Sequence, residues 1–167
     1  MKWKESEART MKGQFYGCET ADVSPVAEKH KSIRDPRMLY DLLLRAWCAD
    51  TCAPRMRADW SPDNPTWGQC SITAFLAQDI FGGKVFGVPL EDGNVHCFNR
   101  IGDCEFDLTS EQFGDVALDY TNSTEQFREI HFAKTEKKLR YEFLKAQLDL
   151  VIGMDKAGQK EPSLLSN

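Results

Sequence analysis

The stretch NPTWGQCSITAFLAQDIFGG, residues 64–83, decides the expected fold, because a loop rich in Pro, Trp and Gly turns there into an apolar segment. The apolar residues after Cys70 recur at the three- and four-residue steps of a helix, and the two closing glycines are typical of a helix end. We expect a helix from Trp67 or Gly68 to Ile80, with Cys70 in its first turn. A thiol at that position lies at the positive end of the helix dipole, which favours the thiolate. Cys70 is therefore a candidate nucleophile.

Three strands are predicted directly after this helix. The segments KVFGVPL, VHCFNRI and CEFDLT have strand patterns and are separated by the turn EDGN and the two-residue loop GD. Such a loop places Ile101 opposite Cys104, so that His96 and Asp107 project from one face as diagonal neighbours on adjacent strands. The imidazole and the carboxylate are then within reach of one another. Asn99 falls on the opposite, core-facing side, where its amide needs a hydrogen-bond partner.

A thiol, an imidazole and a carboxylate together are the groups that thiol catalysis requires. The thiolate attacks, the imidazole accepts and returns a proton, and a third group holds the imidazole in the correct tautomer and orientation. Cys70, His96 and Asp107 occur in that order. The backbone N–H of Cys70 is a candidate oxyanion donor. Further oxyanion or substrate contacts are expected from the loop before it, with Gln69, Asn64 and Trp67 as candidates.

Each of these residues also has a purely structural interpretation. Cysteine is among the most buried residue types, so Cys70 can be a small core residue. His96 can be a strand histidine that bonds a backbone carbonyl, and Asp107 can cap the turn that follows it. Arg100 and Glu105, which the same register opposes, are expected to form a surface cross-strand pair.

Helical patterns flank the central segment. DPRMLYDLLLRAWCADTC has Asp35 as the expected N-cap and Pro36 at the first helical position, and a continuing helix would bring Cys48 and Cys52 onto one face. A helix start is also expected at SPVAEKHKSI, a short helix at STEQFREI, and a long helix at TEKKLRYEFLKAQLDLVI with Thr135 as its cap.

Residues 1–153 are expected to form a single α+β domain. Within it, residues 1–22 are polar with scattered aromatics and form either a loosely attached or a docked arm. Residues 154–167 are expected to be a disordered tail.

Composition excludes several classes of function. The chain has 167 residues, of which 41% are hydrophobic, and a net charge of -5, which provides no basic surface for nucleic acid. No apolar run is long enough for a membrane span, and the charged N-terminus does not fit a signal peptide, so we expect a cytoplasmic protein. The six cysteines are then expected to be reduced. Because Cys48 and Cys52 lack two further ligands at metal-binding spacing, neither a metal nor an organic cofactor is expected.

The order Cys, His, Asp resembles the papain-like and transglutaminase-like superfamily. In that superfamily a cysteine begins a helix packed on a sheet, and histidine and then aspartate or asparagine follow on adjacent strands. The resemblance extends over about residues 67–109. It implies a nucleophile helix packed on an antiparallel β-meander with flanking helices.

Two longer blocks are similar to a narrower family. The segments DWSPDNPTWGQCSITAFLAQDIFGG and HCFNRIGDCEFDLTSEQF contain a W-S-x-x-N-P-x-x-G-Q-C block, followed by N-R-I and D-L-T-S-E-Q-F. These blocks resemble the YunG-type family of small uncharacterised bacterial proteins over about Arg45 to Glu129. The resemblance implies a bacterial origin and brings no established activity with it.

The expected function is that of a cysteine-dependent acyl-transfer enzyme acting on an amide bond, as a peptidase, amidase, deamidase or transglutaminase. Its substrate would be a peptide or another amide-containing molecule. Two alternatives stay open at this point. One is a catalytically silent binding or regulatory protein that keeps the fold, and the other is a redox sensor that pairs Cys70 with Cys48 or Cys52.

Overall fold

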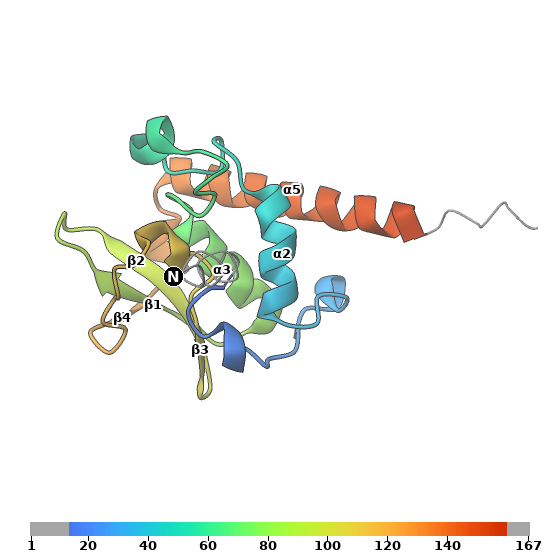
Figure 1. Ribbon diagram of the computed structural model, residues 1–167, viewed down its shortest axis with the longest axis horizontal. Coiled ribbons are helices and arrows are strands. Elements are labelled where there is room, and N and C mark those ends of the chain that lie inside the picture. The colour runs from blue at the N-terminus through green and yellow to red at the C-terminus, as the bar shows by residue number, and fades with distance from the viewer. Residues whose placement is uncertain (1–13, 160–167) are drawn as a thin grey trace, which may run out of the picture.

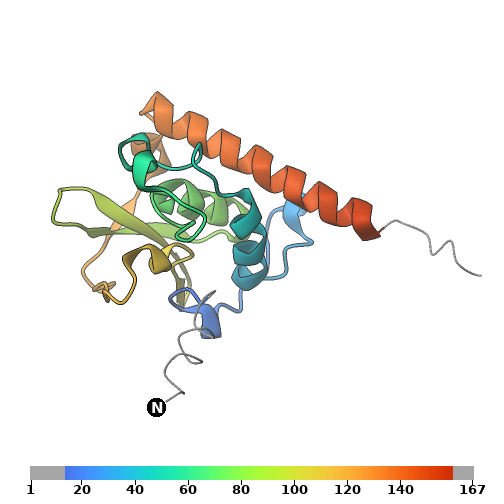
Figure 2. The same ribbon diagram turned by 45° about the horizontal axis from the view of Figure 1, so that its top comes forward.

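The computed structural model describes residues 14–159 and has a mixed α+β architecture. Helix α3 (Cys70–Phe81) lies between an antiparallel sheet and the helices α2 (Pro36–Ala46) and α5 (Thr135–Gln159), as Figures 1 and 2 show. The main cluster of buried side chains extends from Phe15 to Val151 and draws on all of these elements. The coarse α+β prediction is confirmed.

Helix α3 is the centre of this core. Ile72, Phe75, Leu76 and Ile80 are fully buried, as expected for a helix that is apolar on all sides. It ends at Phe81, one residue later than predicted, and the expected closing glycine follows, since Gly82 has a positive φ of 80°. Its start is later than the periodicity predicted, so that Cys70 becomes the first helical residue.

Helix α2 begins as predicted and ends earlier. The Asp35 carboxylate accepts a hydrogen bond from the Met38 N–H at 3.0 Å, with Pro36 in the first position. The prediction that the helix continues through Cys48 and Cys52 is wrong. Trp47 is extended, and its indole N–H donates to the Thr73 hydroxyl of α3 at 3.0 Å, which ties the end of α2 to the central helix.

Another expected helix, starting at Ser24, is also absent from the described chain. That segment contains only the 3-10 turn η2 (Glu28–His30). The Val26 N–H, close to the expected start, instead donates to the Ile80 carbonyl at the end of α3. The backbone of Val26 is therefore hydrogen-bonded to α3 rather than within a helix of its own.

The sheet has four strands in the order β3-β2-β1-β4, all antiparallel. The strands are β1 (Lys84–Pro89), β2 (Val95–Ile101), β3 (Cys104–Phe106) and β4 (Thr124–Gln126). The first three form the predicted meander. The third ends at Phe106, before the end of the predicted CEFDLT segment.

The predicted β2–β3 register is confirmed. Ile101 pairs with Cys104 and Arg100 with Glu105, whose side chains bond at 2.7 and 2.9 Å. Asn99 is buried on the core face, as predicted, and its amide donates to the Ala74 carbonyl of α3 at 2.8 Å. This bond fixes the central helix against β2.

The fourth strand corrects the prediction of a single short helix over STEQFREI. Thr124–Gln126 pairs with β1, and only Arg128–His131 is helical, as α4. Thr124 lies opposite Gly87, where a Cβ would come within 2.9 Å of the Gln126 side chain. The missing side chain at Gly87 thus makes room for the Gln126 side chain, and pairing overrides the local sequence preference.

Helix α5 continues to Gln159, so the prediction that the chain becomes disordered at residue 154 is wrong for residues 154–159. Asp155 in the last turns is held by Arg45 of α2 at 2.6 Å. The remainder of the expected tail, residues 160–167, lies outside the described residues. None of the helices within residues 14–159 is long and apolar enough to cross a membrane.

The described part of the N-terminal arm is docked. Phe15 is buried against Tyr40 and Phe106, and the Tyr16 carbonyl accepts from the Asp107 N–H at 2.9 Å. The short turn η1 (Cys18–Thr20) follows and contacts β3. Of the two alternatives for the arm, the docked one holds over residues 14–22, and residues 1–13 lie outside the described chain.

We predict that Gly17→Ala is markedly more destabilising than Gly102→Ala. Both glycines have a positive φ, 78° and 56°, which costs alanine about 1–2 kcal/mol. A Cβ at Gly17 would in addition come within 2.1 Å of the Glu105 carbonyl oxygen, whereas Gly102 has no neighbour within 4 Å. Urea unfolding of the two variants measures the difference. Equal losses would contradict the close docking of the arm on β3.

Candidate active site

Cys70 is the first residue of α3 and is partly exposed. Two tryptophans hold the preceding loop in shape through hydrogen bonds to its backbone. The indole N–H of Trp60 donates to the Pro65 carbonyl, and that of Trp67 donates to the Met56 carbonyl, both at 3.1 Å. The Cys70 sulfur also lies 4.0 Å from the Val95 carbonyl of β2. The thiol is thus placed where the loop, the helix start and the sheet meet.

His96 and Asp107 form a buried pair beside this helix start. The Nε2 atom of His96 lies 2.6 Å from Oδ2 of Asp107, and each side chain is 1% exposed. Strand β3 pairs with β2 only from Asn99 to Ile101, so its chain is free to diverge after Phe106. The part of β2 that carries His96 is therefore not paired with β3, and the Asp107 carboxylate bonds His96 there. The expectation that the imidazole and the carboxylate reach one another is confirmed.

Both oxygens of the Asp107 carboxylate are satisfied. Oδ2 accepts from the Tyr120 hydroxyl at 2.7 Å as well as from His96. Oδ1 accepts from the N–H and the hydroxyl of Thr109 at 3.1 and 3.3 Å. One oxygen of Asp107 thus bonds His96, and the other bonds the start of the turn that follows it. Hydrogen bonds to the ionised form are what allow a carboxylate to stay charged in a buried site.

Two groups on β2 shift the pKa of Cys70. A hydrogen bond from the Cys97 thiol lowers the pKa of Cys70 well below that of an ordinary thiol, against the effect of burial, and the hydrogen bond and charge of His96 lower it further. Burial disfavours the imidazolium, but Asp107 and the Cys70 sulfur together raise the pKa of His96 to about 10. Both shifts favour a thiolate–imidazolium pair at neutral pH.

Gln112, in the turn η4 (Ser110–Phe113), holds the His96 ring from the other nitrogen. Its Nε2 donates to the Thr109 carbonyl at 2.9 Å, which fixes the amide orientation, and lies 3.3 Å from Nδ1 of His96. An amide nitrogen can only donate, so this contact stabilises the ring when Nδ1 is unprotonated. Phe113 packs edge-on against the same ring, with centroids 4.7 Å apart.

The three loop residues predicted as oxyanion or substrate contacts have different surroundings. Gln69 is fully buried, and its Nε2 donates to the Cys48 carbonyl at 3.2 Å. Its side chain therefore braces the helix start against the end of α2. Asn64 accepts from the Thr66 hydroxyl at 3.5 Å and is partly exposed, as is Trp67. The backbone N–H of Cys70 remains a candidate oxyanion donor at the helix start.

Lys137 lies near the two thiols and is not among the site residues predicted from the sequence. Burial lowers the pKa of Lys137, and the charges of Cys97 and Cys70 act in the opposite direction. Its ammonium group donates to Nδ1 of His131 at 3.0 Å. Burial, followed by the charge of Lys137, lowers the pKa of His131 to about 4, so this histidine is neutral and donates from Nε2 to Gln126.

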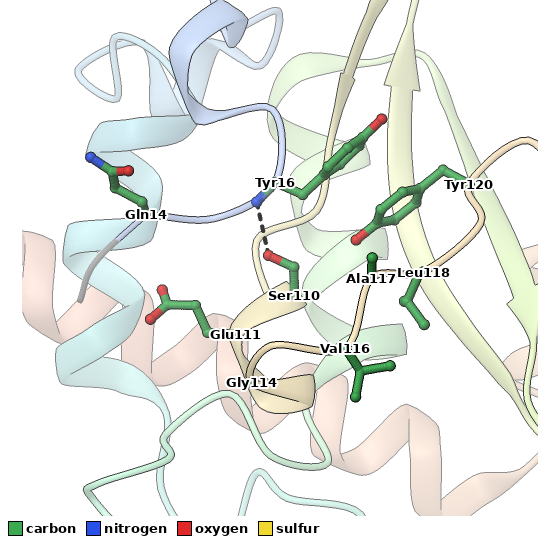
Figure 3. A pocket seen from close by; sticks show the side chains of 9 residues that line it. All are labelled: Gln14, Tyr16, Ser110, Glu111, Gly114, Val116, Ala117, Leu118 and Tyr120. Carbon is green, nitrogen blue, oxygen red and sulfur yellow. Dashed lines mark hydrogen bonds between the residues drawn. The ribbon is translucent and has the colours of Figure 1, made fainter. Parts of the chain in front are cut away.

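Two pockets lie beside rather than at the thiol. One, of about 240 Å³, is formed by the N-terminal segment, η4 and the loop that follows η4, with Tyr16 and Tyr120 facing one another at its edge (Figure 3). The rings of these two tyrosines stack at 3.8 Å. A second pocket of about 490 Å³ lies between α3, α4 and α5 and contains His30 and Arg128 in its lining. The first adjoins the residue that bonds Asp107.

The fold and site define a mixed α+β protein with a helix-initiating cysteine beside a buried histidine–aspartate pair. Residues 35–153, well over half of the chain, match the sequence model of the family described as "YunG protein", and the chain belongs to this family. It is similar to the uncharacterized protein YunG of Bacillus subtilis (strain 168), with 41% identity over 54 residues, or 32% of this chain. That match spans 46% of the Bacillus protein, less than half of its length. No solved structure matches the chain significantly.

Several contacts of the site were not predicted from the sequence, although the signal for some was present. Thr109 and Gln112 belong to the D-L-T-S-E-Q-F block that begins with Asp107. Cys97 lies two residues before Asn99 and so shares its core-facing side, which is the face that α3 covers. Combined with the position of Cys70 at the helix start, this spacing is a signal that the two thiols lie near one another. Tyr120 and Lys137 depend on loop and helix packing that has no periodic signal.

We predict that Tyr120→Phe lowers the free energy of unfolding by about 1–3 kcal/mol, because Asp107 then loses one donor in a buried site. Tyr16→Phe is the matched control. The Tyr16 ring belongs to the same stack, but its hydroxyl donates to the Glu105 carboxylate in a solvent-exposed hydrogen bond. Its loss should stay below about 1 kcal/mol. Urea unfolding at pH 7 compares the two, and equal effects would argue against a stabilised Asp107 carboxylate.

Proposed function

We propose that the protein is a cysteine-dependent acyl-transfer enzyme that acts on an amide bond, with a papain-like or transglutaminase-like arrangement. Cys70 would be the nucleophile, His96 the general base and acid, and Asp107 the residue that orients His96. The observation that carries the proposal is the position of a helix-initiating thiol 4.0 Å from the carbonyl of Val95, the residue before His96, beside a buried histidine–aspartate pair. His96 bonds Asp107 through Nε2, so Nδ1, which the Gln112 amide also approaches, is the nitrogen that would exchange a proton with Cys70.

The reaction follows from these positions. The Cys70 thiolate attacks the carbonyl carbon of the amide, and the developing oxyanion is stabilised by the helix start and the Cys70 N–H. The His96 imidazolium gives its proton to the leaving nitrogen, so that the C–N bond breaks and a thioester remains on Cys70. Water or an amine then attacks the thioester and transfers its proton to His96. This restores the thiolate–imidazolium pair.

Two features of the site support the roles assigned to the side chains. Cys70 keeps partial exposure as a residue, and the indoles of Trp60 and Trp67 are hydrogen-bonded within the preceding loop. The Gln112 amide stabilises the neutral ring that forms when His96 has given up its proton. The mechanism uses only side chains and backbone of this chain and therefore invokes no cofactor.

We predict that Cys70 reacts with iodoacetamide as a thiolate at pH 6. Its pKa is lowered by Cys97 and by His96, so labelling should be nearly independent of pH from 6 to 9. His96→Ala removes the second cause and should slow labelling at pH 6 more than about tenfold, with a smaller effect at pH 9. Mass spectrometry of the Cys70 peptide measures the rates.

The matched control for this experiment is His30→Ala. His30 is also a buried histidine beside an aspartate, with Nε2 3.5 Å from Asp149, but it lies in the pocket between α3 and α5. Its replacement should leave the Cys70 profile unchanged. If native Cys70 labels no faster than the other thiols and does not respond to His96→Ala, the proposed function is wrong.

We also predict turnover of an amide substrate that depends on the orienting carboxylate. The purified protein is incubated with peptides that contain glutamine, asparagine and blocked termini, together with a primary amine. Released ammonia, new N-termini and incorporated amine are measured separately, which identifies deamidation, hydrolysis or transfer. Cys70→Ala should abolish the reaction and Asp107→Asn should reduce its rate about a hundredfold or more. Turnover that survives Cys70→Ala would refute the role of the thiol.

A further inference from the structure

Cys97 is a second thiol at the candidate active site. It is buried at 1% exposure in β2, between Val95, whose carbonyl faces the Cys70 sulfur, and Asn99, whose amide holds the Ala74 carbonyl of α3. Both of these contacts fix the face of β2 that carries Cys97 against the first turns of α3. Cys97 therefore faces the start of α3, where Cys70 lies, and each thiol shifts the pKa of the other. From this placement a disulfide forms when the two sulfurs approach to the S–S bond length of ~2.05 Å.

The two thiols differ in the way that a pair of attacking and resolving cysteines requires. Cys70 is partly exposed and has a lowered pKa, so it is the thiolate that meets an oxidant from solution. Cys97 is buried, and its pKa is raised well above the ordinary value, first by its hydrogen bond to Cys70 and then by burial. It stays a protonated thiol while Cys70 is reduced.

We propose that a hydroperoxide oxidises Cys70 and that Cys97 resolves the product as a reversible Cys70–Cys97 disulfide. The thiolate of Cys70 attacks the peroxide oxygen, the O–O bond breaks, and a proton from the imidazolium of His96 completes the water or alcohol that leaves. This step forms a sulfenic acid on Cys70. The Cys97 sulfur then attacks that sulfur and displaces its hydroxyl, which leaves as water with the Cys97 proton. The two cysteines are oxidised and the hydroperoxide is reduced.

The charges around the pair favour the second step. The contact with the Cys70 sulfur is the largest cause of the raised pKa of Cys97, and oxidation of Cys70 removes its negative charge. The positive charge of Lys137 lowers the pKa of Cys97 and is then no longer opposed by a second thiolate. Cys97 therefore ionises more readily once Cys70 has been oxidised.

The structure selects a different partner for Cys70 than the redox alternative considered from the sequence. Cys52 is fully buried, and its sulfur lies 3.6 Å from the Ala53 carbonyl. A Cβ added at Gly68 would come within 2.5 Å of the same sulfur, so Cys52 is packed against the backbone of the loop. Cys97, by contrast, lies on the face of β2 that packs on the start of α3.

The regulatory meaning of this disulfide rests on the proposed function, whereas its formation does not. With Cys70 as the catalytic nucleophile, the disulfide would switch off acyl transfer and also protect the thiol from irreversible oxidation. Thiols restore the reduced pair by exchange. The site would then be active only under reducing conditions.

The test is a hydrogen peroxide titration of the full-length reduced protein. We expect intact mass to show the loss of two hydrogen atoms, and peptide mapping without reduction to show Cys70 linked to Cys97. Dithiothreitol should then restore the labelling of Cys70 by iodoacetamide. In Cys97→Ser and Cys97→Ala the link should be absent, dimedone should trap a sulfenic acid at Cys70, and recovery by dithiothreitol after excess peroxide should fall more than about tenfold.

Cys52→Ser is the matched control, because it also removes a buried thiol, and it should form the Cys70–Cys97 link normally. Oxygen addition at Cys70 of the wild type without a link, or a link from Cys70 to Cys48 or Cys52, would overturn the inference. The wild-type mapping alone decides this, even if a Cys97 variant does not fold. Rapid labelling and amide turnover without a disulfide would refute only the inference, whereas a disulfide without turnover would refute only the proposed function.

Discussion

The buried carboxylate of Asp107 is the constraint on which the candidate site depends. A charged group that is shielded from water needs compensating donors, and here they come from three separate parts of the chain: His96 of β2, Thr109 beside η4 and Tyr120 in the following loop. The Asp107 N–H is bonded in addition to the Tyr16 carbonyl of the N-terminal segment. Loss of any of these partners would leave the buried Asp107 carboxylate with an unmade hydrogen bond, which is energetically costly. The edge of the sheet, η4 and the N-terminal segment are therefore held in place together.

The same carboxylate connects fold stability with reactivity. It supports the positive charge of His96, and that charge in turn favours the thiolate of Cys70. The block D-L-T-S-E-Q-F has a physical reason to be contiguous, because Asp107, Thr109, Gln112 and Phe113 all surround one imidazole or its partner. One short segment thus supplies the acceptor, its donors and the packing of the ring.

Local rules determined the parts of this structure that could be predicted. The helix caps of α2 and α3 follow from Asp35 and Gly82, and the two-residue hairpin loop fixed the register that brings His96 to Asp107. The elements that were missed or misplaced depend on distant contacts. Strand β4 depends on its pairing with β1, where the Gln126 side chain packs over Gly87, and α5 runs to Gln159 with its last turns held by Arg45. The amide of Gln69 faces the Cys48 carbonyl because α2 ends earlier than its sequence pattern suggests.

The docked segment around Tyr16 precedes the part of the chain that matches the family, which begins at residue 35. Its backbone acceptor and its aromatic ring nevertheless adjoin the residues that set the basicity of His96. A relative with a different leading segment would surround the same histidine and aspartate with a different dielectric and a different set of dipoles. Evolution can therefore adjust the proton affinity of the imidazole by changing residues that never meet the reacting atoms, while the block that contains Asp107 stays intact.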